Sequence, residues 1–279
     1  MTTRPVVLSI AGYDPSSGAG ITADVKTAAA LGCYAVTCIT ALTVQSTQGV
    51  FAVEPVRPET IRETLSRLAD DFELAAVRIG MLGTADNAET VADFLRQSRP
   101  KNVVFDPVLR SSSGAELTDG LGIEVIRSQL LPLSDVITPN FEEALLLTGI
   151  DAEETWPAES QHGMVDILRE LAERLHQMGS KSVVITGGHL PEVNDFLSFS
   201  ESGKTVEHVF PGTRIDSRAT HGTGCAFAMA LACLLARGRG LPVAVGEAKE
   251  FVRQAMLAAY PVGRGTGPMN HLFRLPEEP

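Results

Sequence analysis

Short β-branched apolar runs recur along the chain and alternate with segments of helical periodicity. The runs are Val6–Ile10, Val77–Ile79, Val103–Phe105, Val136–Ile137 and Val183–Ile185. Their apolarity is continuous rather than alternating, which is typical of strands covered on both faces in a parallel sheet. Because parallel strands need crossover connections, this alternation predicts an α/β fold with helices on both faces of the sheet.

Two of the intervening segments show the pattern of a helix with one buried face. Apolar residues recur every three or four positions over 164–178, and Gly179 follows where a terminating glycine is expected. Another helix is predicted to begin at Pro58 and to bury Ile61 and Leu65.

Antiparallel pieces are predicted at the sheet edges. Residues 195–200 and 205–210 flank the four-residue segment 201–204, which indicates a hairpin. Residues 51–56 are interpreted as a second edge piece. Since no linker or repeat is evident, residues 1–279 are expected to form a single domain.

Composition excludes several classes of protein. Hydrophobic residues make up 44% of the 279 residues, which argues against disorder, and the net charge of −11 argues against a general nucleic-acid binder. The longest uncharged apolar run, residues 225–236, falls short of the ~18 residues of a membrane span. The four cysteines form no Cys-x-x-Cys pair, so free thiols and a cytoplasmic location are expected.

Two glycine-containing loops are candidates for ligand binding. In residues 12–20, glycines follow the first strand, where a ligand can approach the backbone; an ordinary loop is an equally good interpretation. In residues 220–225, glycines precede an apolar helix, whose free N–H groups suit a phosphoryl group. Cys225 at that helix end could have a lowered pKa and act as base or nucleophile, or be a small buried hydrophobe.

Two further positions carry oxygen or amide groups of interest. Asn140 and Glu143 lie one helical turn apart and can face a hydrated Mg²⁺, although this spacing also predicts a helix cap. The amide of Gln45 offers a donor beside an acceptor, which matches an aminopyrimidine edge. A solvated loop glutamine is the alternative.

Taken together, these motifs resemble those of the hydroxymethylpyrimidine/phosphomethylpyrimidine kinases of thiamine biosynthesis. The matching segments, in order along nearly the whole chain, are residues 9–24, 40–49, 79–82, 106–108, 138–144, 187–190, 220–225 and 267–271. The resemblance implies a ribokinase-like three-layer α/β/α fold with a central, mainly parallel sheet and a small antiparallel edge hairpin. It also implies ATP- and Mg²⁺-dependent phosphorylation of 4-amino-5-hydroxymethyl-2-methylpyrimidine and of its monophosphate, by a homodimer.

The resemblance also assigns roles to individual residues. Gln45 is expected to bind the aminopyrimidine edge, and the rest of the substrate pocket is expected to include Gly12, Asp24, Met81 and Val108. Phosphoryl transfer is assigned to Gly222, Gly224 and Cys225, with Cys225 as general base. The nucleotide is assigned to Asn140, Glu143, Thr186, His189, Arg218 and Thr223, with Asn140 and Glu143 serving Mg²⁺ through water.

The chain departs from the family pattern at two places. Thr186 stands where the family usually has a lysine facing phosphate, and Arg110 follows Asp106-Pro107-Val108-Leu109 near the substrate wall. An active kinase with weak ATP affinity is therefore predicted, with Arg218 supplying the missing charge. The alternatives are a pyridoxal kinase of the same fold and a pyrimidine-binding protein with little kinase activity.

Overall fold

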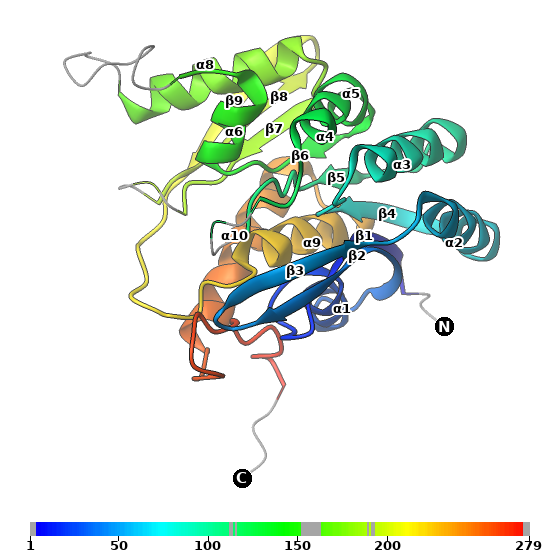
Figure 1. Ribbon diagram of the computed structural model, residues 1–279. Coiled ribbons are helices and arrows are strands. Elements are labelled where there is room, and N and C mark those ends of the chain that lie inside the picture. Colours follow the sequence, from blue (N-terminus) through cyan, green and yellow to red (C-terminus); the bar gives the residue numbers. More distant parts are fainter. Residues whose placement is uncertain are drawn as a thin grey trace.

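The computed structural model describes residues 4–111, 114, 116–151, 163–188, 190 and 193–275. They form one nine-stranded sheet with the order β3-β2-β1-β4-β5-β6-β7-β8-β9 (Figure 1). The parallel strands are β1 (Val6–Tyr13), β2 (Tyr34–Ser46), β4 (Leu74–Ile79), β5 (Val103–Phe105), β6 (Val136–Ile137) and β7 (Ser182–Ile185). The antiparallel strands at the edges are β3 (Gly49–Pro55), β8 (Asp195–Glu201) and β9 (Lys204–Phe210).

Helices cover both faces of the sheet (Figure 1). One face carries α1 (Gly20–Ala30), α9 (Thr223–Ala236) and α10 (Leu241–Leu257). The other carries α2 (Pro58–Asp71), α3 (Ala85–Ser98), α4 (Gly120–Val125), η1 (Ile126–Leu130), α5 (Leu131–Leu133), α6 (Phe141–Thr148) and α8 (Met164–Gln177). The predicted layered α/β architecture is thus confirmed.

Successive residues of the central strands belong to different cores. Val7 packs in the cluster with α9 and α10, whereas Leu8 packs in the cluster with α2, α3 and α8. Likewise, Val183 packs in the cluster with α2, α3 and α8, and Val184 packs in the cluster with α9 and α10. This two-sided burial is the physical reason for the continuous apolar runs. Helix α9 lies inside the molecule, and among the described residues no helix combines the length and apolarity of a membrane span.

The edge hairpin is confirmed, but its loop is shorter than predicted. Strands β8 and β9 continue until Glu201 pairs with Lys204, which leaves only Ser202 and Gly203 in the turn. Both residues have positive φ, 51° and 77°, as a two-residue turn between twisted strands requires.

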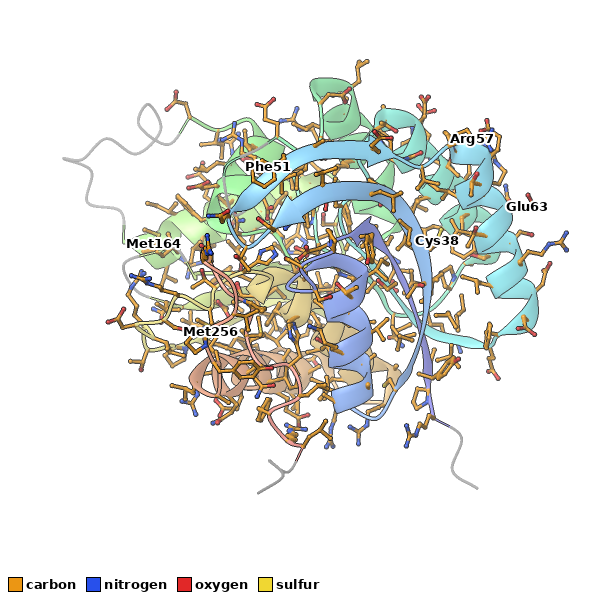
Figure 2. The ribbon with its side chains drawn as sticks, turned by 60° about the horizontal axis from the view of Figure 1, so that its bottom comes forward. Cys38, Phe51, Arg57, Glu63, Met164 and Met256 are labelled. Carbon is orange, nitrogen blue, oxygen red and sulfur yellow. The ribbon has the colours of Figure 1, made fainter. Side chains whose placement is uncertain are left out.

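Strand β2 corrects the sequence interpretation most strongly. Residues 34–46 were not identified as a strand, and Gln45 was considered as a possible loop residue. In the structure β2 pairs with β1 up to Leu42 and then continues beside β3 as a projecting ribbon. Leu42, Val44 and Phe51 are exposed on this ribbon, and Figure 2 shows Phe51 on it.

Candidate active site

The parallel strands place the candidate residues at one edge of the sheet. The carboxyl ends of parallel strands lie together, and ligands of open α/β sheets bind there. The first glycine loop follows β1, Met81 follows β4, and Asp106 follows β5. Asn140 follows β6 and Thr186 follows β7. Residues that are far apart in the sequence therefore meet at this edge.

Asp14 organises the first glycine loop. Its Oδ1 accepts hydrogen bonds from the Ser16 N–H and hydroxyl, and its Oδ2 accepts from the N–H groups of Gly18 and Ala19 and from His221 Nε2. Burial by itself raises the pKa of Asp14, but the bonds from His221, Ser16 and Ala19 outweigh burial and lower the pKa to about 2. The N–H groups of Gly18 and Ala19 are thus already bound to a carboxylate, which favours the structural interpretation of this loop.

The two glycine loops contact each other directly. A Cβ added to Gly18 would lie 2.2 Å from Cδ2 of His221, so only glycine admits the imidazole at this position. Gly222 has φ 81° and precedes α9, and its Cβ would lie 1.9 Å from the Gly18 carbonyl oxygen. Glycine at both positions therefore brings the N-terminus of α9 against the end of β1.

The first turn of α9 lies where the sequence predicts an anion site. The first N–H groups of any helix lack partners within the helix, and they carry a partial positive charge. At α9 these groups belong to Thr223, Gly224 and Cys225, and Gly224 is exposed. The Thr223 hydroxyl donates to the Thr220 carbonyl oxygen and fixes the turn. This arrangement can bind the oxygens of a phosphoryl group.

A buried arginine lies next to the first turn of α9. Arg78 is fully buried, and its guanidinium forms ion pairs with Asp24, at 3.0 Å, and with Asp106. A Cβ on Gly80 would lie 2.2 Å from Arg78 Nη1, so that glycine makes room for the guanidinium. Sequence reasoning missed Arg78 because it counted residues 77–79 as an apolar run. The signal was a charge inside an otherwise apolar strand.

The Cys225 thiol interacts with Arg78, with Asp106 and with the Gly20 N–H. Burial raises the pKa of Cys225 to about 11, although Arg78 opposes this shift. The expectation of a lowered thiol pKa is therefore wrong. The cost of burying a thiolate next to two carboxylates exceeds the stabilisation that the helix end provides.

Alkylation of the native protein tests this pKa. Cys225 is the one cysteine that is not fully buried, so iodoacetamide is expected to modify it first. Because only the thiolate reacts, the rate should rise roughly tenfold per pH unit from pH 8 to pH 10. A Cys225→Ser variant is the control for labelling elsewhere. A rate that levels off by pH 8 would contradict the raised pKa.

Asp24 does not line an open pocket, contrary to the expectation from the sequence. It has no exposed surface, and its Oδ2 accepts hydrogen bonds from Ser9 and Arg78. Burial raises the pKa of Asp24 to about 6, while Arg78 opposes the shift. Asp24 therefore contacts Arg78 in the interior, and it can influence a substrate only by positioning the Arg78 guanidinium.

Asn140 and Glu143 form the helix cap that their spacing allows. Asn140 Oδ1 accepts from the Glu143 N–H, and Glu143 Oε2 accepts from the Asn140 N–H, each at 2.9 Å. Burial, followed by the nearby charge of Asp106, raises the pKa of Glu143 to about 8. Two buried carboxylates that repel each other fit a nearby cation. The described residues contain no group of three acidic, histidine or cysteine ligands. A hydrated Mg²⁺, which keeps several waters, would fit Asn140 and Glu143 alone.

The three remaining candidates for nucleotide binding are Thr186, Arg218 and His189, and the two that the structure describes lie on separate segments. Thr186 lies beside Asn140, and its N–H donates to the Pro139 carbonyl oxygen. Arg218 is exposed on the segment before α9, where its carbonyl oxygen accepts from the Gly267 N–H. His189 lies outside the described residues.

Three of the predicted substrate-pocket residues are neighbours. A Cβ on Gly12 would lie 3.0 Å from the Met81 sulfur. Met81 and Val108 pack in one small apolar cluster with Ala41 and Leu117. These residues form an apolar cluster beside the end of β1.

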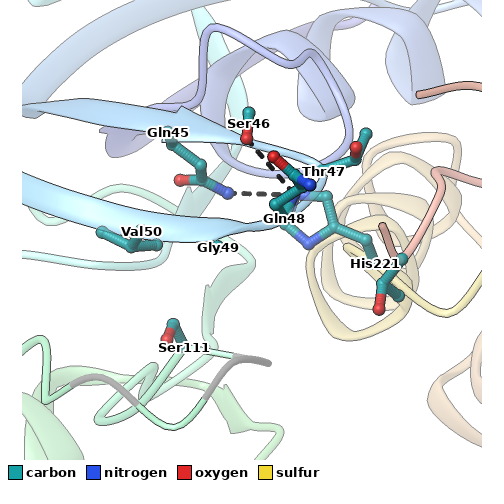
Figure 3. A pocket seen from close by; sticks show the side chains of 9 residues that line it. Gln45, Ser46, Thr47, Gln48, Gly49, Val50, Ser111 and His221 are labelled. Carbon is teal, nitrogen blue, oxygen red and sulfur yellow. Dashed lines mark hydrogen bonds between the residues drawn. The ribbon is translucent and has the colours of Figure 1, made fainter. Parts of the chain in front are cut away.

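Gln45 lies in a pocket with His221 at the turn that joins β2 to β3 (Figure 3). The pocket encloses about 370 Å³, open solvent included, and residues 46–50, Ser111 and Thr266 complete its lining. Gln45 Nε2 lies 3.2 Å from His221 Nε2, and Gln45 Oε1 lies 3.0 Å from the Thr43 hydroxyl. The sequence did not single out His221, apart from its place in the motif.

A family model described as phosphomethylpyrimidine kinase matches residues 14–270. The chain belongs to this family. It is 39% identical to a hydroxymethylpyrimidine/phosphomethylpyrimidine kinase of Streptomyces coelicolor, over 99% of this chain and 97% of that protein. It is also 39% identical to the thiamine biosynthesis bifunctional protein ThiED of Geobacter sulfurreducens, but spans only 53% of the length of that relative.

Solved structures agree with the family assignment and confirm the fold. A phosphomethylpyrimidine kinase from Clostridium difficile 630 is 35% identical, with a TM-score of 0.75 over 90% of this chain and 99% of that one. An ADP complex of Bacillus subtilis pyridoxal kinase is 33% identical, with a TM-score of 0.82 over 96% of this chain and 98% of that one. The fold thus accommodates a nucleotide in a similar protein.

Proposed function

We propose that this phosphomethylpyrimidine kinase family member transfers the γ-phosphoryl group of ATP to 4-amino-5-hydroxymethyl-2-methylpyrimidine and then to its monophosphate. The observation that carries the proposal is the junction of the two glycine loops. There the N-terminus of α9, Asp106, Cys225 and the Gln45–His221 pocket meet at the carboxyl edge of the sheet. Residues 1–279 act as one kinase domain.

Different residues of the chain bind the phosphoryl group, position the reacting groups and accept the proton. The N–H groups at the start of α9 bind the migrating phosphoryl oxygens, because charge in such a reaction gathers on those oxygens. Arg78 holds Asp106 and Cys225 in place behind them. Cys225 accepts the hydroxyl proton only as its thiolate, which is a minor fraction near neutral pH because the pKa of the thiol is raised to about 11. The proton leaves the hydroxyl late in a loose phosphoryl transfer, so the need for this base is small.

The nucleotide and its cation are assigned to the ends of β6 and β7. Asn140 and Glu143 would hold a hydrated Mg²⁺, which would supply positive charge against the phosphates. Thr186 adds a hydroxyl but no charge, and the exposed Arg218 supplies the guanidinium. The chain forms homodimers in the cytoplasm, and the exposed apolar side chains Leu42, Val44 and Phe51 support self-association.

ADP release with three substrates tests the proposed function. The pyrimidine alcohol and its monophosphate are expected to stimulate ADP release in the presence of ATP and Mg²⁺, and pyridoxal is expected to stimulate it less. Preference for pyridoxal would favour a pyridoxal kinase, as the Bacillus subtilis structure allows. Pyrimidine binding without ADP release would identify a binding protein.

Substitution of Gln45 tests how the ring is bound. Gln45→Ala is expected to raise the Michaelis constant for the pyrimidine alcohol tenfold or more, because a buried donor–acceptor pair on the ring loses its partners at a cost of about 1–3 kcal/mol. Gln97→Ala, on the exposed surface of α3 and outside the pocket lining, is the control. An unchanged Michaelis constant in Gln45→Ala would remove Gln45 from the site.

A further inference from the structure

The proton on His221 is fixed by Asp14. His221 Nε2 lies 2.8 Å from Asp14 Oδ2, which also accepts from the Gly18 and Ala19 N–H groups. An ionised carboxylate can only accept hydrogen bonds. His221 Nε2 must therefore carry a hydrogen, because two lone pairs at this distance would repel each other.

This proton determines which end of the Gln45 amide can face His221. The amide nitrogen lies 3.2 Å from His221 Nε2, and both groups are donors. A half-turn about the terminal side-chain bond brings the amide oxygen against the ring N–H instead, whose single hydrogen is then shared between Asp14 Oδ2 and the amide oxygen. The amide nitrogen then donates to the Thr43 hydroxyl, which itself donates to the Tyr13 carbonyl oxygen. Every donor in this series of groups then faces an acceptor.

The resulting orientation suits one arrangement of a pyrimidine ring. In the 4-amino-5-hydroxymethyl ring, the amino group lies between ring nitrogen N3 and the hydroxymethyl group. The amide oxygen must therefore face the amino group, and the amide nitrogen must face N3. His221 precedes Gly222 and α9, so the amide oxygen lies toward the phosphoryl site. The hydroxymethyl group then points to the same end of the pocket.

We propose that His221 is a specificity-determining residue that fixes the orientation of the Gln45 amide, so that the site selects 4-aminopyrimidines over 4-oxopyrimidines. The proposal rests on the proposed function, in which Gln45 binds the ring edge. A 4-oxo ring carries an acceptor at position 4 and a hydrogen on N3, which is the reverse of the amino pattern. In the 4-oxo ring, the oxygen at position 4 would face the oxygen of the Gln45 amide, and the N3–H would face the amide nitrogen. Both contacts are unfavourable when His221 fixes the amide.

Binding of two matched rings to the full-length protein tests the proposal. Dissociation constants are measured by calorimetry for the 4-amino alcohol and for its 4-oxo analogue. The wild type is expected to prefer the amino ring by at least about 100-fold, since buried polar groups left unpaired discriminate strongly. In His221→Leu the amide is free to turn, and the preference should fall below about tenfold. His221→Gln, which keeps a donor, should retain the wild-type preference.

Controls separate failure of the inference from failure of the proposed function. His208→Leu, on exposed β9, should leave both dissociation constants unchanged, and His221→Ala replaces His221→Leu if the leucine variant does not fold. If the wild type does not discriminate, or if His221→Leu weakens both rings equally, the inference is wrong. If Gln45→Ala retains the full preference, Gln45 does not bind the ring, and the proposed site itself fails.

Discussion

Replacing Arg78 by methionine is expected to lower the free energy of unfolding by about 3–5 kcal/mol, because it leaves two buried carboxylates without their cation. Asp24 and Asp106 both pair with this guanidinium, and all three side chains are buried. Turnover is expected to fall by more than about 100-fold as well, since Asp106 and Cys225 lose the group that positions them. Denaturant unfolding and steady-state kinetics measure the two effects.

Two variants sharpen this prediction. Arg78→Lys keeps the charge but cannot bridge two carboxylates with a planar fork, so an intermediate loss of stability is expected. Arg67→Met removes an arginine from the exposed surface of α2 and should change stability by less than about 0.5 kcal/mol. Equal stability of Arg78→Met and Arg67→Met would show that the buried ion pairs do not stabilise the fold.

Replacing Gly224 by alanine is expected to lower kcat by about 10²–10³ without loss of stability. Gly224 is exposed in the first turn of α9, and its Cβ would have Asp106 Oδ1 at 4.0 Å as its nearest neighbour. The methyl group fits the folded protein but occupies the space in front of the helix N-terminus, where a phosphoryl oxygen must bind. Loss of one hydrogen bond from a backbone N–H to the transition state typically lowers kcat by about 10²–10³.

Stability measurements distinguish this effect from damage to the fold. Alanine is a better helix former than glycine, so the free energy of unfolding should stay the same or rise by up to about 1 kcal/mol. Gly246→Ala, in α10, has ordinary contacts with Phe210 and provides the matched control, with wild-type kcat. A Gly224→Ala variant with wild-type kcat would show that phosphoryl transfer takes place elsewhere.

The sequence predicted those parts of the fold whose residues repeat a simple pattern. Continuous apolar runs predicted the central strands because both sheet faces are covered, and Val7 and Leu8 indeed pack in different cores. Strand β2 was missed because its outer half extends beyond β1 and pairs only with β3. Leu42 and Val44 are exposed there, so burial imposes no apolar pattern on that segment.

The sequence predicted the site as a set of motifs, but not how its charges interact. The glycines of the two loops were recognised, yet their contact depends on Gly18 and His221, which are about 200 positions apart. Asp24 was assigned to the pocket from the family resemblance, and its ion pair with Arg78 could not be inferred because Asp24 lies on α1 and Arg78 on β4. The pKa of Cys225 could not be inferred from its helix position, because burial and Asp106 act against the helix end.

Mass spectrometry of the reaction products tests the central claim most directly. The protein is incubated with ATP, Mg²⁺ and 4-amino-5-hydroxymethyl-2-methylpyrimidine, and the products are followed with time. The account predicts that a monophosphate forms first and a diphosphate follows, and that Gly224→Ala slows both steps while Gly246→Ala slows neither. A pyrimidine that remains unphosphorylated at saturating ATP and Mg²⁺, with the folded protein present, would contradict the account.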